Sequence, residues 1–231
     1  MLFAEQSQAV CAVYAQAPDR RVNGGYTLSI DEMTGIQALE RAAPTKPCQP
    51  GQIEKREFEY IRHGTQTLIA NLDVATGQIV CPSIGPTRTE QDFVEHIARA
   101  VATDPTAQWT FVLDQLNTHQ SESLVRFVAD ACCLPLDLGH KGETGILASM
   151  PTRAAFLTDP SHRIRFVYTP KHSSWLNQIE IWFSILMRRL LKRASFLSTA
   201  DLRQRLLDFI AFFNQTAKPF KWTYKGRPLQ V

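Results

Sequence analysis

Three carboxylates stand at places where predicted elements begin or end. Asp31 follows a short run of strand-forming residues, YTLSI, and Asp114 follows the near-continuous apolar run WTFVL. Glu180 lies in the first two turns of a predicted helix, beside its apolar face. Ligand sites in open α/β sheets gather at the carboxyl ends of strands. If the two strands are neighbours, Asp31 and Asp114 therefore meet at one edge of the sheet, where Glu180 can reach them.

Such a cluster would have a definite chemistry. Carboxylates repel one another unless a cation neutralises them, and hard oxygen ligands suit Mg²⁺ or Mn²⁺. Two such ions, bridged by carboxylates, activate an attacking oxygen and stabilise a leaving oxygen in phosphodiester chemistry. Acidic residues at strand ends also cap helices or face solvent, so the spacing alone leaves both interpretations open.

A strand and a long helix are predicted to position Glu180. Residues 163–168 alternate apolar and basic side chains, which is typical of a strand, and Pro170 ends it. Ser173 or Ser174 can cap the helix that follows. Apolar residues then recur at helical spacing, at Ile179, Trp182, Phe183, Leu186 and Leu190. This pattern predicts one long helix with a buried face.

The remaining segments predict an α/β domain with a mixed sheet and helices packed on it. Residues 57–61 alternate like a strand, and residues 65–74 and 78–84 form a predicted hairpin. Residues 33–56 contain three prolines and are expected to be an irregular connection. Helices are predicted at residues 1–17, 89–102 and 121–131, with a last helix starting near Ser198.

Composition places the chain among ordinary folded proteins and locates its positive charge. The 231 residues suffice for one large domain, and the net charge is +3. From Leu186 to the C-terminus there are ten Lys and Arg against two Asp, so this third is strongly basic and the rest is mildly acidic. A basic end suggests a polyanionic partner. A basic face that is merely solvated explains the composition equally well.

Cysteine usage and hydropathy indicate the cellular compartment of the protein. The five Cys are odd in number and have no CxxC spacing, which argues against a disulfide framework or a zinc site. The N-terminus lacks a signal peptide pattern, and no apolar run is long enough to span a membrane. We therefore expect a cytoplasmic protein without a membrane partner.

Around the three acids the local sequence carries a family resemblance. The segments SIDEMTG, VLDQLNTH and TPKHSSWLNQIEIWFS resemble motifs of the DDE transposases of bacterial insertion sequences, most closely the six-thirty family of the mariner-like superfamily. The resemblance runs from about residue 20 to the C-terminus and includes EYIRHGTQTLIAN and PFKWTYKGRPL. It implies an RNase H-like fold and metal-dependent DNA cleavage and strand joining.

The resemblance also assigns residues. It implies that Asp31, Asp114 and Glu180 are the three catalytic acids and together hold two Mg²⁺ or Mn²⁺ ions. Asn117, His119 and Asn177 match supporting positions of the family motifs. His172 and a set of basic residues are candidate DNA contacts, although helix-dipole complementation or capping explains several of them as well. That set is Arg188, Arg189, Lys192, Arg193, Lys221 and Lys225.

Two features depart from the family pattern. Residues 131–160 form an insertion between the fourth and fifth strands, which is expected to be a lid, a contact to a second subunit, or a surface elaboration. Residues 1–20 provide only a short helix or linker before the catalytic domain at 21–231, whose basic helical end begins at about 186. Relatives carry helix-turn-helix domains there, so a separate chain could supply DNA recognition.

The partners implied are transposon-end and target DNA and further copies of the chain, as a dimer or a larger assembly. Two other functions stay open from the sequence. One is another RNase H-like nuclease, and the other is a decayed or repurposed fragment that binds DNA or partner chains without cutting.

Overall fold

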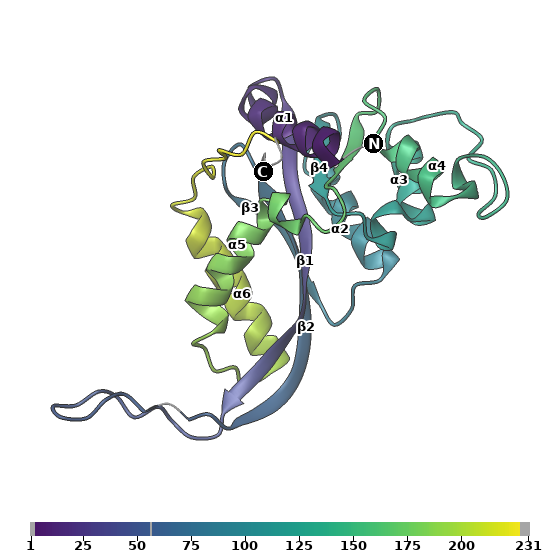
Figure 1. Ribbon diagram of the computed structural model, residues 1–231. Helices are drawn as coiled ribbons and strands as arrows, with labels where there is room; N and C mark the ends of the chain where they lie inside the picture. Colours follow the sequence, from purple (N-terminus) through teal and green to yellow (C-terminus); the bar gives the residue numbers. More distant parts are fainter. Residues whose placement is uncertain (1–2, 56, 227–231) are drawn as a thin grey trace.

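A five-stranded mixed sheet organises the computed structural model, which describes residues 3–55 and 57–226 (Figure 1). The strand order is β3-β2-β1-β4-β5. Strand β1 is antiparallel to β2 and parallel to β4, and β4 is parallel to β5. The strands are β1 (Gly25–Arg41), β2 (Tyr60–Asp73), β3 (Ile79–Gly85), β4 (Gln108–Leu113) and β5 (Ile164–Tyr168).

Helices cover both faces of this sheet (Figure 1). Helices α2, α3 and α4 lie on one face, and α1, α5 and α6 lie on the other. The α/β class and the mixed sheet predicted from the sequence are therefore confirmed. The helices are α1 (Phe3–Val22), α2 (Glu90–Ala102), α3 (Glu122–Ala131), α4 (Met150–Leu157), α5 (Ile179–Leu186) and α6 (Thr199–Asn214).

Alternation along the strands sends apolar side chains to both faces. Leu28 and Ile30 of β1 pack with α2 and α3. Val112 of β4 packs on the opposite face, against α1. Trp182 of α5 is fully buried against α6. Because both faces are covered, β4 reads as a near-continuous apolar run.

The local signals for helix starts hold in most places. Thr89 forms a capping box with Asp92 at the start of α2. Ser121 accepts a hydrogen bond from the Leu124 N–H, and Ser198 accepts one from the Asp201 N–H. Each cap satisfies a backbone donor that has no partner inside the helix.

Strand β1 is much longer than expected. Residues 33–41, predicted to be irregular, continue β1 and pair with β2 as far as Arg41 and Tyr60. Of the predicted separate strand at 57–61, only Tyr60 and Ile61 belong to β2, and residues 57–59 are not in a strand. Beyond this pairing, residues 42–55 and 57–59 form an arm that projects away from the body at the lower left of Figure 1. Cross-strand pairing decides the strand here, although residues such as Gly35 have a low strand propensity.

The predicted long helix is in fact several pieces. A 3₁₀ turn, Ser174–Leu176, precedes α5, and a π-helical turn, Met187–Leu191, follows it. The prediction that Ser173 or Ser174 caps the helix is wrong, because α5 begins after Gln178 without a side-chain cap. The N-terminal helix also extends to Val22 and includes Pro18, beyond the predicted end at residue 17.

The insertion at 131–160 lies between β4 and β5 as predicted. Part of it belongs to the core, because Leu147, Phe156 and Leu157 are buried with α2 and α3, whereas residues 140–145 are exposed. The side chain of Arg153 is also buried and donates to the carbonyls of Gln120, at 2.7 Å, and Leu147, at 3.0 Å. In the described part of the chain, no helix has the length and apolarity needed to cross a membrane.

Candidate active site

The parallel pairing of β1 and β4 brings the two aspartates to one place. The last paired residues are Ser29 and Val112, and Asp31 and Asp114 each stand two residues further along. The condition set out from the sequence, that their strands are neighbours, is met. The sequence predicted that Asp31 stands at the end of its strand. Instead, Asp31 lies where β1 continues beyond the end of β4.

Asn177 connects this part of β1 to the start of α5. Its Nδ2 atom donates to the Ile30 carbonyl at 2.9 Å and to Asp31 Oδ2 at 3.2 Å. The hydroxyl of Ser29 donates to Asn177 Oδ1 and accepts from the Ile179 N–H at 2.9 Å. All of these bonds except the part-buried one to Asp31 are buried, and together they fix where the helix begins relative to Asp31. Glu180 consequently lies in the first turn of α5.

Tyr14 of α1 also forms hydrogen bonds to the residues that directly precede α5. Its hydroxyl donates to the Leu176 carbonyl at 2.9 Å and accepts from the Gln178 N–H at 3.2 Å. Burial raises the pKa of the Tyr14 phenol well above its usual range, so the ring remains a neutral donor. No local signal in the sequence indicated this role. Tyr14 is part of an apolar helical face, and its hydrogen-bond partner Leu176 is 162 residues away along the chain.

His119 lies buried between two carboxylates. Its Nδ1 atom is 2.8 Å from Asp114 Oδ1, and its Nε2 atom is 3.0 Å from Glu32 Oε1. The Tyr168 hydroxyl donates to the His119 carbonyl at 2.7 Å. Sequence reasoning selected His119 but missed Glu32. Alternation turns Glu32 away from Asp31, towards the face that holds His119.

The electrostatics show that the acids influence one another. Burial raises the pKa of Asp31 to about 7, assisted by the negative charges of Asp114, Glu32 and Glu180. Burial and the charge of Asp114 raise the pKa of Glu180. Burial also acts to raise the pKa of Asp114, but the bond and charge of His119 outweigh it and lower that pKa. Burial disfavours the charged imidazole, yet Asp114 and Glu32 raise the pKa of His119 to about 9.

These donors fit a hard divalent cation in kind. Asp31 Oδ1 accepts the Glu32 N–H, and Asp31 Oδ2 accepts Asn177, so each oxygen keeps a free lone pair. A cation would also relieve the repulsion that raises the pKa of Asp31. Among the described residues, however, no three His, Cys, Asp or Glu side chains are arranged to hold a metal ion together. The three acids therefore shift one another's pKa values, but their side chains are not arranged as a complete set of metal ligands.

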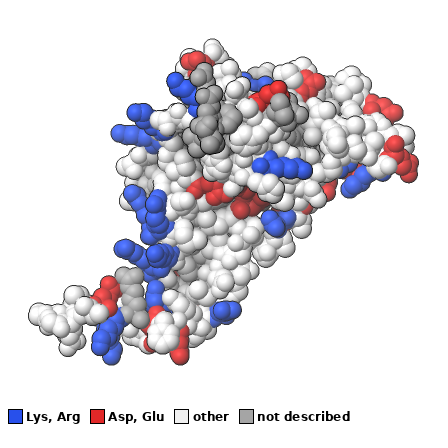
Figure 2. Space-filling model, viewed as in Figure 1, with Lys and Arg blue, Asp and Glu red and all other residues white. Residues whose placement is uncertain are grey.

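The other predicted residues take different positions. His172 is exposed, has a φ of +60°, and lines a cavity of about 400 Å³ together with Asp114. Asn117 is exposed, and its side chain makes no hydrogen bond within the described part of the chain. The predicted cations are all exposed, at Arg188, Arg189, Lys192, Arg193, Lys221 and Lys225. Figure 2 shows Lys and Arg gathered along the side that carries α5 and α6.

Comparison with known structures identifies the fold. The Mos1 mariner paired-end complex with Mn has a TM-score of 0.54 and 13% identity, over 90% of this chain and 55% of that chain. The catalytic domain of Mos1 mariner transposase has a TM-score of 0.51 and 10% identity, over 90% of this chain and 81% of that chain. This chain thus spans about half the length of the Mos1 chains in the complex. Its fold is that of an RNase H-like DDE transposase catalytic domain.

Comparison at the sequence level identifies the family. No curated protein sequence matches this chain. The sequence profile described as DDE superfamily endonuclease matches residues 27–203, which include Asp31, Asp114 and Glu180. The match covers more than three quarters of the chain, which therefore belongs to the DDE superfamily of endonucleases.

Proposed function

We propose that this chain is the catalytic domain of a bacterial insertion-sequence transposase of the six-thirty family, which cuts transposon ends and joins them to target DNA. The observation that carries the proposal is the pairing of β1 with β4, because Asp31 and Asp114 each stand two residues beyond the last paired residues, at the same end of these strands. Asn177 then ties the helix that bears Glu180 to the same strand. The family match and the likeness to the Mos1 catalytic domain support it.

Asp31, Asp114 and Glu180 would hold Mg²⁺ or Mn²⁺, with two ions expected. When bound, these ions supply charge neutralisation and activation of the attacking and leaving oxygens of a phosphodiester. The solved Mos1 complexes include one with Mn and a catalytic domain with Mg. In this chain His119 fixes one oxygen of Asp114, which leaves the other oxygen free to turn towards a cation.

DNA is the expected substrate, and the basic side of α5 and α6 is the expected contact surface. Exposed cations at the end of α5 can bind phosphates and position a duplex without reading its sequence. Mos1 transposase has been solved with its left transposon end as a paired-end complex. We expect this chain to act on DNA as a dimer or larger assembly in the bacterial cytoplasm, with end recognition supplied by a helix-turn-helix region.

A cleavage assay on end-containing DNA with Mn²⁺ tests the proposal. Wild-type protein is expected to give nicked and joined products, alone or with a candidate helix-turn-helix chain. Asp31→Asn, Asp114→Asn and Glu180→Gln should each abolish both products while the circular dichroism spectrum is unchanged. Asp130→Asn, a change at an exposed acid of α3, is the matched control and should cut normally.

The outcomes separate the rival functions. Hydrolysis without joined products would make the chain a plain nuclease of the same fold. DNA binding without cutting, with wild-type and variants alike, would make it a non-catalytic fragment. Normal cleavage by Asp114→Asn would overturn the assignment of the site.

A further inference from the structure

A second polar cavity lies at the other end of the same strands. It has a volume of about 430 Å³ and is lined by Arg20 of α1, Arg165 of β5 and Thr110 of β4, among others. Gly25 and Gln108, the first residues of β1 and β4, also line it. It is therefore separated from Asp31 and Asp114 by most of the length of the parallel strands.

Two half-buried arginines share one hydroxyl in this cavity. Arg20 Nη1 donates to Thr110 Oγ1 at 2.6 Å, and Arg165 Nε donates to the same oxygen at 3.2 Å. Arg20 Nη2 also donates to Gln16 Oε1 at 3.2 Å. Each guanidinium has five N–H donors, so most of their donors remain available. Two cations that meet at a neutral oxygen repel each other.

Within residues 3–55 and 57–226, no carboxylate pairs with either of these charges. Neither arginine forms an ion pair with any residue in the described part of the chain. Asp19 lines the cavity but is exposed and bonds neither guanidinium. Burial lowers the pKa of both arginines, and the charge of Arg20 lowers the pKa of Arg165 further. The local electrostatics therefore favour the arrival of an anion.

A buried histidine adds an unused polar atom. His162 lines the same cavity and is 7% exposed, and its Nδ1 atom has no hydrogen-bond partner among the described residues. A buried polar atom without a partner is unfavourable unless a ligand or water satisfies it. Helix-dipole complementation accounts for Arg20, in the last turn of α1, but not for Arg165 or His162.

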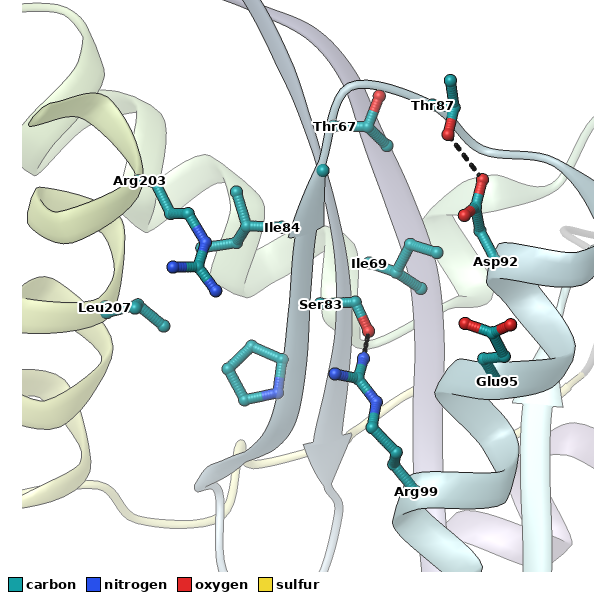
Figure 3. A pocket seen from close by; sticks show the side chains of 12 residues that line it. Thr67, Ile69, Ser83, Ile84, Thr87, Asp92, Glu95, Arg99, Arg203 and Leu207 are labelled. Carbon is teal, nitrogen blue, oxygen red and sulfur yellow. Dashed lines mark hydrogen bonds between the residues drawn. The ribbon is translucent and has the colours of Figure 1, made fainter. Parts of the chain in front are cut away.

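A different cavity is also lined by two arginines but has two acids in its lining. The cavity beside β3 is lined by Arg99 and Arg203, and the acids Asp92 and Glu95 line it as well (Figure 3). Arg99 donates to the Ser83 hydroxyl there. The two arginines and two acids that line it carry no net charge, whereas Arg20, Arg165 and Asp19 leave a net charge of +1 around the other cavity.

We propose that the cavity between Arg20 and Arg165 binds a phosphate group. Guanidinium groups recognise phosphate oxygens through two parallel hydrogen bonds, and one doubly charged phosphate balances both arginines. A single carboxylate would balance only one of them. The phosphate group can belong to free phosphate or to a DNA backbone, and this site is independent of the cleavage function proposed above.

The test is a titration of the full chain with sodium phosphate, with sodium chloride of equal ionic strength as the reference and EDTA present throughout. Saturable thermal stabilisation is expected for the wild type, with a dissociation constant from calorimetry. Arg20→Gln and Arg165→Gln should each weaken phosphate binding at least tenfold. Arg21→Gln is the matched control, because Arg21 stacks on Tyr26 and pairs with Asp73 instead.

A second arm identifies the source of the phosphate. If the site takes DNA backbone phosphates, Arg165→Gln weakens binding of a labelled duplex and free phosphate competes with the duplex. If it takes free phosphate, both variants bind the duplex as the wild type does. The proposal is overturned if phosphate stabilises the wild type no more than chloride does, a result that does not depend on any variant folding. It is also overturned if both Gln variants bind phosphate with wild-type affinity.

Discussion

His119 joins the two halves of the candidate active site at the scale of single residues. The buried imidazole bridges Asp114 and Glu32, and the side chain of Glu32 is only 4% exposed. Asp114 needs the histidine for orientation, while Glu32 needs it to balance a buried charge. The contact with Asp114 should therefore affect activity, and the contact with Glu32 should affect stability. The two effects can be measured separately.

Replacing His119 by Leu should affect both. Removing one member of a buried ion pair is typically destabilising by about 3–5 kcal/mol, so we expect a loss of roughly 3 kcal/mol in the free energy of unfolding. Loss of the group that orients Asp114, a proposed metal ligand, should lower cleavage by about 10–100-fold. Urea denaturation and the cleavage assay measure the two effects.

The double variant Glu32→Gln, His119→Gln serves as the control. It removes the buried charge together with its partner, so it should recover part of the stability without recovering cleavage. An unfolding midpoint for His119→Leu equal to that of the wild type would show that the pair is not buried as described.

The start of α5 is the critical junction at the scale of elements. Glu180 is positioned by backbone and side-chain bonds from Ser29, Asn177 and Tyr14 rather than by a conventional N-cap. Each bond joins segments that are more than 140 residues apart in the sequence. The helix therefore begins where the tertiary structure dictates.

Asn177→Ala tests this junction. The change removes the hydrogen bonds to Ser29, Ile30 and Asp31, so we expect a loss of about 1–3 kcal/mol in the free energy of unfolding. Amide hydrogen exchange at residues 179–182 should become faster, because these amides begin α5.

Asn117→Ala is the matched change. Its side chain is exposed and makes no hydrogen bond within the described residues, so stability should change by less than about 0.5 kcal/mol. Equal losses for the two asparagines would refute the role given to Asn177.

Elements that depend on local signals could be predicted from the sequence, whereas elements that depend on contacts between distant segments could not. Apolar periodicity and turn residues predicted β3, β4, β5, α2 and α3 nearly to the residue, because these signals are local. The extension of β1 to Arg41 was not predicted, since it depends on pairing with β2. The break of the long helix into 3₁₀, α and π turns was not predicted either, and the bonds that fix the start of α5 come from segments far away in the sequence.

The candidate site divides in the same way. The three acids and Asn177 were selected from motifs, and the neighbouring strands that bring the aspartates together were anticipated. Glu32 and Tyr14 were missed, because their partners are fixed only by the folded chain. A glutamate beside Asp31 was visible in the sequence, but nothing local indicated that His119 would face it.

At the scale of the whole molecule, helices cover both faces of the sheet, and the two faces have different roles. The face with α1, α5 and α6 builds the acidic site and the basic side seen in Figure 2. The opposite face, with α2, α3 and α4, holds the larger apolar core and His96. His96 is fully buried, and its Nδ1 atom bonds the Ser83 hydroxyl.

Acid stability should depend on His96. Burial, followed by the charge of Arg99, lowers its pKa from 6.5 to about 3. The unfolded chain binds a proton below pH 6.5 that the folded chain does not, so stability contributed by neutral His96 is present above that pH and lost as pH falls. Between pH 7.5 and 5.5 the loss should be roughly 1 kcal/mol.

Comparing wild type with His96→Gln isolates this contribution. Gln has no proton to gain in this range, so its unfolding free energy should fall by roughly 1 kcal/mol less between the two pH values. Other groups, including Asp31, titrate equally in both proteins and cancel in the difference. Parallel pH profiles for the two proteins would contradict the buried, neutral histidine.

The most direct test of the account is a crystal of this chain soaked in Mn²⁺, with an anomalous difference map calculated at the manganese edge. The account predicts manganese peaks within about 2.0–2.6 Å of carboxylate oxygens of Asp31 and Asp114, with Glu180 turned towards them. Manganese bound elsewhere, with those carboxylates left uncoordinated, would contradict it.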